Sequence, residues 1–397
     1  MDKAVYRVVG SPHPNRQERM SQLEELGFTW GDLDHYWIDQ VVSIDQQMWD
    51  EIKFASQNLW TIFDKAARFT FGKRDLYALL SIPEVLWDAL DLLLPNEAEK
   101  LSRYARFDYS ITEQGEIKLF ELNADTPTGY VESSVVTPWI CDQYELNSPN
   151  VTMKEQIRLA WEKEKPDYAT CIAYGEHLED SGTIDMLVKH SGLEVKCIDT
   201  LELSVDDGVV KDKELNPVRS MFALYPKEWM AVDDGGEALA YSIESKNIEI
   251  FNSLHSIILQ SKGLQAVIWG LHELDSEIFT KEEHECIEKY MLPTYNKPIF
   301  DGNYVSKSMF GREGGSVRLY DHQGTLETQD EEGYDTSVLF DRVYQKRIDL
   351  PKLEMHTGAF HLLTGIFMIN GEPCGLLGRA GGLITGNSSH FIAMGVR

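Results

Sequence analysis

Two strand-like segments joined by a short turn constrain the fold more than any other feature of this sequence. Residues 103–111 read RYARFDYSI, residues 116–124 read EIKLFELNA, and the TEQG between them offers Gly115 for a tight turn. Strand-like segments on either side of a glycine-containing turn predict a β-hairpin. The second segment runs into DTPTG, so oxygen atoms that accept hydrogen bonds are concentrated at its end.

Polar side chains share one face of each strand in this hairpin. Arg106 and Asp108 are two residues apart, as are Glu121 and Asn123, and residues two apart lie on the same face of a strand. If the pairing brings both faces to one side, two carboxylates, an amide oxygen and a guanidinium converge. Such hard oxygen ligands suit Mg²⁺ when phosphate oxygens complete its coordination. A solvated hairpin face with a salt bridge from Arg106 is the alternative.

The first hundred residues look helical. Between Ser43 and Phe71, apolar residues recur every three or four positions, a spacing that places them on one face of a helix. They are Met48, Ile52, Ala55, Leu59, Ile62, Ala66 and Phe69. Residues 75–94 are also helical in composition, and Pro83 must start a new helix or kink the old one. Core packing explains both patterns.

Helices and strands alternate after the hairpin. The predicted elements are, in order, helices near 131–146 and 151–164, a strand at 167–175, a helix ending at His190 and a strand at 193–199. This alternation predicts an α/β unit. Residues 204–216 indicate a polar hairpin or loop. The last third is β-rich, with glycine turns and an NGEP hairpin signal.

Charge excludes one class of partner. The 397-residue chain has 37 Lys and Arg residues against 65 Asp and Glu residues, a net charge of −28. This field repels phosphate backbones, so nucleic acid is not expected, whereas a polyamine or another basic substrate is tolerated. General solubility explains the charge equally well. With no long apolar run and no apolar signal core at the start, neither a membrane span nor export is expected, and the prediction is a cytoplasmic protein of unassigned oligomeric state.

Cysteine and histidine patterns predict neither a disulfide framework nor a histidine metal site. The five cysteines are widely separated, form no CxxC pair and are expected to be buried thiols: Cys141, Cys171, Cys197, Cys286 and Cys374. Only His356 and His361 come close in sequence. In a strand, their spacing of five sends them to opposite faces.

The stretch KSMFGREGGSV has the composition of a phosphate-binding loop. Gly311, Gly314 and Gly315 permit a tight turn whose backbone N–H groups can approach phosphate oxygens, and Lys307 and Arg312 supply positive charge. GxxxxGK[ST] is absent, so this is not a Walker loop. The strand-loop-strand setting suggests a flexible flap over a nucleotide. A glycine-rich hairpin without a ligand is the alternative.

Two further basic residues stand beside glycines in otherwise acidic company, Lys262 in LQSKGLQA and Arg379 in GLLGRAGG. Each is either a surface residue or a ligand at the end of an element. Residues 343–351, VYQKRIDLP, close a strand before Pro351. They could cross between two lobes, where adenine often hydrogen-bonds to the backbone.

Taken in order, these segments resemble the synthetase part of glutathionylspermidine synthase and the related stand-alone acid-amine ligases of the ATP-grasp group. The resemblance covers nearly the whole chain, through DHYWIDQ, RFD, LFELNADTPTG, LYPKEWM, SKGLQAVIW, SKSMFGREGGSV, VYQ and GRAGGLIT. It implies an α/β (α+β) chain with an ATP-grasp fold. Three regions are expected: a helical N-terminal segment at 1–100 packing on the core, a pre-ATP-grasp α/β region at 101–235, and ATP-grasp nucleotide-binding lobes at 236–397.

The resemblance also implies a role for each candidate site residue. Asp108, Glu121 and Asn123 would hold Mg²⁺ against the ATP phosphates. Arg106 and Arg312 would act in catalysis, with Arg312 in the closing phosphate loop. The expected ATP-binding residues are Lys262, Lys307, Gly311, Arg312, Gly314, Gly315 and Gln345, the last near adenine at the hinge between lobes. The expected substrate-binding residues are Arg106, Thr126, Thr128, Glu179 and Arg379, of which Arg379 would grip a substrate carboxylate.

The implied reaction is ATP- and Mg²⁺-dependent ligation. ATP would phosphorylate a substrate carboxylate, and an amine would attack the acyl phosphate to give an amide. The acid would be a small peptide such as glutathione, and the amine a polyamine such as spermidine. The chain has no room for the amidase domain of the bifunctional enzyme, so amide hydrolysis is expected to be missing.

The chain departs from the family pattern in its substrate region. Thr126 and Thr128 stand where the bifunctional enzyme has serines, Lys227 in YPKEW replaces a large aromatic residue, and Ala380 follows Arg379 where an acid is expected. These departures concern the acid and the amine and leave the phosphate chemistry intact. Two rival functions stay open: a nucleotide- or polyamine-binding protein of this fold that does not ligate, and a metal-dependent hydrolase.

Overall fold

The computed structural model describes residues 4–11, 14–162, 169–173, 177–312, 314–330 and 339–397. Helices and strands are mixed along the chain, which confirms the predicted α/β class. Within the described residues, no helix combines the length and the apolar character that a membrane crossing requires.

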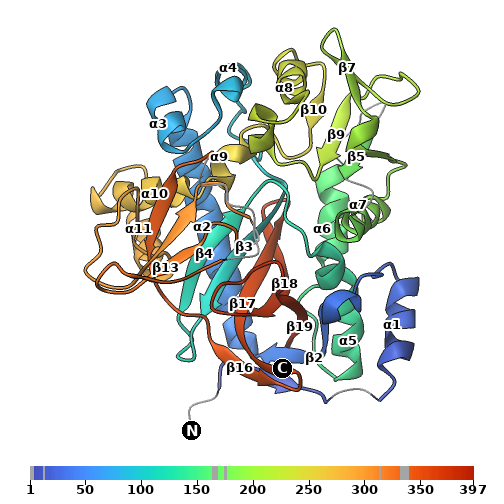
Figure 1. Cartoon of the computed structure of the whole chain (residues 1–397), viewed down its shortest axis with the longest axis vertical. Coiled ribbons are helices and arrows are strands. Elements are labelled where there is room, and N and C mark those ends of the chain that lie inside the picture. Colours follow the sequence, from blue (N-terminus) through green and yellow to red (C-terminus); the bar gives the residue numbers. More distant parts are fainter. Residues whose placement is uncertain (1–3, 12–13, 163–168, 174–176, 313, 331–338) are drawn as a thin grey trace.

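An eight-stranded sheet forms the centre of the molecule (Figure 1). Its strands are β1 (Arg7–Val9), β2 (Trp37–Ile44), β3 (Tyr104–Ile111), β4 (Ile117–Asn123), β16 (Lys352–Met355), β17 (Gly358–Ile369), β18 (Glu372–Gly381) and β19 (His390–Val396). Their order is β1-β2-β19-β18-β17-β3-β4, with β16 also paired to β17. The pairing of β19 with β2 is parallel and the others are antiparallel. The sheet therefore takes strands from all three predicted regions of the chain.

The predicted hairpin is formed by β3 and β4, and Gly115 in its turn has a positive φ of 84°. Asp108 pairs with Glu121, but the next pair joins Tyr109 to Leu119, so Phe120 is an extra residue, a β-bulge. The bulge reverses the alternation of side chains along β4. Leu119 is therefore buried in the apolar core, while Glu121, two residues later, belongs to the polar face.

Helices pack on the central sheet and on the smaller sheets. They are α1 (Arg16–Glu25), α2 (Gln46–Thr70), α3 (Arg74–Leu79), α4 (Trp87–Leu92), α5 (Thr137–Gln143), α6 (Met153–Trp161), α7 (Leu178–Ser191), α8 (Gly236–Glu244), α9 (Ser256–Gln260), α10 (Gly263–Glu273) and α11 (Lys281–Tyr290). Short 3-10 turns lie at Leu33–His35 (η1), Glu84–Leu86 (η2), Thr200–Glu202 (η4) and Lys227–Ala231 (η5), and a π-helical segment lies at Glu132–Val136 (η3). The long helix α2 buries its predicted stripe, and its Phe63 ring lies 5.5 Å from that of Phe107 on β3. The Asp45 carboxylate caps its first turn by accepting from the Met48 N–H at 2.9 Å.

The prediction that the first hundred residues are helical is incomplete, because this region also supplies β1 and β2. All eight residues of β2 are buried. Trp37 and Val41 belong to one apolar cluster, and Ile38 and Val42 belong to another. A strand buried on both faces has no regular alternation of apolar and polar residues, so the pattern gave no clear strand signal.

Three smaller sheets complete the fold. The strands β5 (Ala169–Ala173), β6 (Lys196–Asp199), β9 (Ser220–Ala223) and β10 (Glu249–Ile250) form a parallel sheet in the order β10-β9-β5-β6. The alternating pattern predicted β5 and β6 but not β9 and β10. The outer parts of the predicted strand 167–175 lie outside the described residues. The strands β7 (Ser204–Asp206) and β8 (Val209–Lys211) form the polar hairpin.

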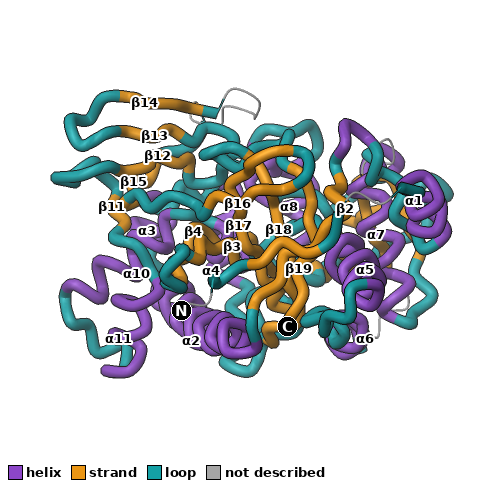
Figure 2. Tube along the Cα trace, turned by 90° about the horizontal axis from the view of Figure 1, so that it is seen from below, coloured by secondary structure: helices purple, strands orange, loops and turns teal. Residues whose placement is uncertain are grey.

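The third small sheet is antiparallel and lies at the end of the molecule opposite α1 (Figure 2). It contains β11 (Thr294–Tyr295), β12 (Tyr304–Ser308), β13 (Arg318–Tyr320), β14 (Leu326–Gln329) and β15 (Arg342–Lys346), in the order β11-β15-β12-β13-β14. Residues 347–351 connect it to β16, which pairs with the central sheet. The segment VYQKRIDLP therefore crosses between two sheets.

Two minor predictions need correction. His356 lies in the turn between β16 and β17 rather than in one strand with His361, and its Nε2 is 3.3 Å from Asp39 Oδ1. Cys141, Cys286 and Cys374 are buried thiols as expected, but Cys197 is exposed because β6 is an edge strand. The side chain of Cys171 lies outside the described residues.

Candidate functional site

One cavity is lined by residues of both the central sheet and the five-stranded sheet. Every residue that the sequence assigned to a site lines it: Arg106, Asp108, Glu121, Asn123, Thr126, Thr128, Glu179, Lys262, Lys307, Gly311, Arg312, Gly314, Gly315, Gln345 and Arg379. Positions spread over more than half of the chain therefore meet at one place. The oxygen-rich end of β4 and the glycine loop between β12 and β13 face the same cavity.

Arg106 and Asp108 form a tight ion pair on the polar face of β3. The guanidinium donates from Nε to Asp108 Oδ1 at 2.7 Å and from Nη2 to Oδ2 at 2.9 Å. Its Nη1 donates to the Thr128 carbonyl at 2.7 Å. Both side chains are buried, so the face carries the salt bridge of the alternative interpretation without being solvated. Arg106 thus joins the hairpin to the segment that follows β4.

Cations surround Glu121. Burial alone would raise its pKa, but Lys262, 3.2 Å away, Lys307 and Arg106 outweigh burial and lower the pKa to about 2. Lys262 precedes α10, is itself buried, and also donates to the Gly311 carbonyl at 2.6 Å. The carboxylate is therefore ionised across the physiological range.

Asp108, Glu121 and Asn123, the three residues expected to hold Mg²⁺, lie beside one another. Asn123 donates from Nδ2 to Asp108 Oδ2 at 3.0 Å and to Glu121 Oε1 at 3.4 Å, so the three side chains are neighbours. Among the described residues, no group of three or more His, Cys, Asp or Glu side chains is arranged to hold a metal. A metal here would take two carboxylates and the amide oxygen, and would need further oxygens from a bound ligand.

The β-bulge supplies part of the lysine site. As the extra residue in β4, Phe120 keeps its carbonyl available, and this oxygen accepts from Lys307 Nζ at 3.0 Å and from Gln265 Nε2 at 3.2 Å. Lys307 also donates to Gln345 Oε1 at 2.9 Å, and Gln345 is held by Gln265 and Thr294. Burial lowers the pKa of Lys307 to about 8, although Glu121 opposes this.

The glycine loop approaches other backbone so closely that side chains would not fit. Gly314 has a φ of 74°, and a Cβ there would lie 2.8 Å from the Thr385 carbonyl. A Cβ on Gly311 would lie 2.8 Å from the Gly315 carbonyl. From this loop, Arg312 reaches across to Glu228 and to Thr126 Oγ1, which it contacts at 2.7 Å. The loop is therefore docked on two sides.

Several residues of the site were missed by the sequence analysis. Tyr36 lines the cavity, and its hydroxyl donates to the buried Glu132 at 3.0 Å, as does Trp30 Nε1 at 2.8 Å. Burial, reinforced by the negative charge of Glu179, raises the pKa of Glu132 to about 7. The motif DHYWIDQ was the only signal for Tyr36, and nothing in the sequence linked Glu132 to it.

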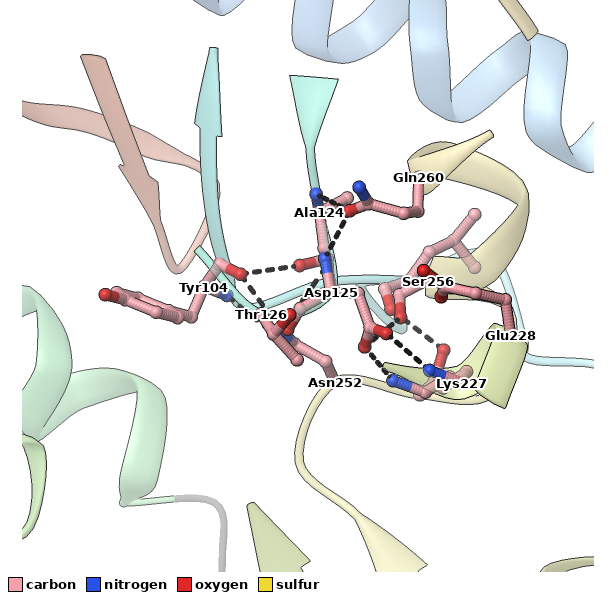
Figure 3. Close-up of polar contacts among 12 residues, drawn as sticks. Tyr104, Ala124, Asp125, Thr126, Lys227, Glu228, Asn252, Ser256 and Gln260 are labelled. Carbon is pink, nitrogen blue, oxygen red and sulfur yellow. Dashed lines mark hydrogen bonds and ion pairs between the residues drawn. The ribbon is translucent and has the colours of Figure 1, made fainter. Parts of the chain in front are cut away.

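Two of the departures noted in the sequence, Lys227 and Ala380, have different surroundings. Lys227 is buried at the start of η5, and its backbone N–H and its ammonium group both donate to Asp125 at the end of β4 (Figure 3). Ala380 lies in the apolar core on β18, whereas its neighbour Arg379 lines the cavity and donates to the Gly386 carbonyl at 2.9 Å. An acid at position 380 would therefore lie in the apolar core.

Comparison with known proteins agrees with this geometry. Residues 11–397 match the family model described as "Glutathionylspermidine synthase preATP-grasp". A Haemophilus influenzae protein named "Putative acid-amine ligase" is 25% identical over 409 aligned residues, which cover 97% of this chain and 98% of that protein. The family and this relative both indicate a ligase. The chain belongs to the glutathionylspermidine synthase family.

Proposed function

We propose that this enzyme is an ATP- and Mg²⁺-dependent carboxylate-amine ligase that works through an acyl phosphate. The observation that carries the proposal is the cavity, where carboxylates of one sheet meet cations from separate elements: Lys262 before α10, Lys307 on β12 and Arg312 in the glycine loop. Phosphoryl transfer needs mainly positioning and neutralisation of charge, and this arrangement supplies both.

In this proposal separate groups of residues bind the metal ion and the nucleotide. Asp108, Glu121 and Asn123 would hold Mg²⁺, which would neutralise charge on the phosphate oxygens. Lys262, Lys307 and the N–H groups of the glycine loop bind the triphosphate, and Gln345 lies toward adenine. The docked loop excludes water, which would otherwise hydrolyse an acyl phosphate.

The acid and amine subsites follow from the remaining lining residues. Thr126, Thr128 and Arg379 orient the acid, a small peptide such as glutathione. Arg106 and Arg312 stabilise the charge that develops as the carboxylate is phosphorylated. Glu179 attracts a cationic amine, for which a polyamine such as spermidine is the first candidate, in keeping with the net charge of −28. We propose the three regions 1–100, 101–235 and 236–397 as helical segment, pre-ATP-grasp region and nucleotide-binding lobes, and a cytoplasmic location.

The test is phosphate release from ATP with acids and amines supplied singly and in pairs. Release that requires a pair, with an amide product seen by mass spectrometry, supports ligation. Tight ATP binding without turnover under any pairing would instead mean a binding protein of the same fold. Release of phosphate from ATP alone would point to a hydrolase.

Arg106→Ala separates catalysis from binding in this scheme. We expect turnover to fall by roughly 100-fold or more, because a buried cation aimed at developing charge is lost. The affinity for ATP, measured by calorimetry, should change only modestly. Arg158→Ala, which alters an exposed pair on α6, is the matched control and should leave turnover unchanged. An unchanged rate in Arg106→Ala would remove its assigned role.

A further inference from the structure

Arg312 of the glycine loop is held by a buried carboxylate that does not line the cavity. Its Nε lies 2.9 Å from Glu228 Oε1 and its Nη2 3.1 Å from Oε2, so the pair is bidentate. Its Nη1 donates to Thr126, which lines the cavity. Glu228 is 1% exposed, whereas the Arg312 side chain is 23% exposed. One edge of the guanidinium is thus anchored in the protein while another faces the cavity.

The residues next to Glu228 and Thr126 are also held by buried polar contacts (Figure 3). Glu228 follows Lys227 in η5, and Lys227 is paired with Asp125, the residue before Thr126. The N–H groups of Ala124 and Asp125 donate to Gln260 Oε1 at 2.8 and 3.1 Å, and the Asp125 carbonyl accepts from Asn252. Two buried acids therefore face two cations, and their charges balance. If Arg312 left this group, Glu228 would stay buried without its cation, which is strongly unfavourable.

We propose that Glu228 is a positioning residue for Arg312, fixing the plane of the guanidinium so that Nη1 stays beside Thr126, where the nucleotide phosphates meet the acid substrate. This inference rests on the proposed function. It couples docking of the glycine loop to the acid subsite, because Arg312 connects the two. Glu228 acts only through Arg312 and touches neither substrate.

Kinetics of Glu228→Gln test the positioning role. With ATP, glutathione and spermidine, or the pair identified by the phosphate-release screen, kcat should fall roughly 10- to 100-fold, since a hydrogen-bonded charge is lost. The KM for ATP should change little. Glu228→Asp, which keeps the charge, should recover part of the loss. Glu155→Gln, which alters an exposed pair on α6, should behave as wild type. An unchanged kcat in Glu228→Gln, or a loss confined to the KM for ATP, overturns the proposal.

Trypsin provides a readout that does not need activity. Cleavage after Arg312, detected as fragments 1–312 and 313–397, should be faster in Glu228→Gln than in wild type, with Glu228→Asp between them. If no acid-amine pair is ligated by wild type, the proposed function fails, yet faster cleavage still supports the anchoring and unchanged cleavage overturns it.

A double variant distinguishes positioning from a general effect on the fold. In an Arg312→Ala background, adding Glu228→Gln should cause no further loss of kcat and should raise the unfolding temperature, because the carboxylate left without its cation is removed. A further loss of kcat would show that Glu228 acts through the fold and would overturn the proposal.

Discussion

The buried acid beside Lys227 explains how the structure accommodates a lysine at a position where the family pattern has a large aromatic residue. Its ammonium group lies among buried groups, and its partner Asp125 is 1% exposed. The large aromatic side chain expected from the family pattern would leave Asp125 without this cation. The departure in the sequence is therefore tied to the charge balance at the end of β4.

Replacing Lys227 should destabilise the protein strongly. Lys227→Met leaves a buried carboxylate without its nearest cation, and we expect a loss of about 3–5 kcal/mol in the free energy of unfolding, measured in urea. Adding Asp125→Asn should restore most of the loss. Lys211→Met, which removes an exposed pair with Asp206, is the control and should have no measurable effect. Equal effects of Lys227→Met and Lys211→Met would contradict this prediction.

Lys307 should make ATP binding depend on pH. Because burial lowers its pKa to about 8, the side chain is charged below that pH and neutral above it. Attraction to the phosphates is therefore lost as the pH rises. We expect the affinity for ATP, measured by calorimetry, to fall roughly tenfold between about pH 7 and about pH 9. Lys307→Arg keeps its charge and should flatten the profile. A flat profile in wild type would exclude a role for this titration.

At the scale of single residues, the sequence identified those site residues that stand in short motifs together with other site residues. Spacing placed Arg106 with Asp108 on one face of a strand and Glu121 with Asn123 on one face of the next, and the observed pairing brings the two faces to one side. Glu228 and Glu132 were missed because their partners Arg312 and Tyr36 lie about a hundred residues away. Local pattern contains no information about such contacts.

The backbone of the glycine loop depends on the absence of side chains at its glycines. Gly314→Ala would combine an unfavourable positive φ with a clash against the Thr385 carbonyl. We expect undocking of the loop and roughly a tenfold loss in ATP affinity or turnover, because water exclusion and Arg312 placement depend on it.

Gly324 provides a matched control for this variant. It also has a positive φ, of 76°, but a Cβ there meets only the Tyr304 hydroxyl at 3.7 Å, and it does not line the cavity. Gly324→Ala should therefore cost some stability and leave the activity intact. Equal losses of activity in both variants would mean that general strain, rather than loop docking, is responsible.

Among the elements, helices with one apolar stripe and strands with clear alternation were predictable from sequence. The stripe of α2 and the alternation of helices and strands around β5 and β6 belong to this group. The strand β2 was not, because it is buried on both faces. The bulge at Phe120 was not either, because the extra residue is visible only against its partner strand.

At the scale of the whole molecule, the central sheet pairs strands that are far apart in the sequence. β2 from the first hundred residues pairs in parallel with β19 near residue 396, and β3 pairs with β17. No sequence pattern indicated these long-range pairings, although the α/β class itself was predicted. We therefore expect the central sheet to unfold as one unit.

Ile392→Ala tests this cooperativity. Ile392 on β19 is fully buried between β18 and β2, and its truncation should cost about 2–5 kcal/mol. In urea, far-ultraviolet circular dichroism and tryptophan fluorescence should shift together to lower denaturant, as expected for one transition. Two separated transitions, with only one of them shifted, would show that the strands belong to independent units.

The bulge in β4 limits how this enzyme can diverge. Substitutions along the strand can retune charge and size at each position, since every side chain keeps its direction. Loss of one codon at Phe120 would instead make the pairing of β3 with β4 regular and remove the carbonyl that Lys307 uses. Homologues with new substrate preferences should therefore differ in the residues of β4 but not in the number of residues it contains.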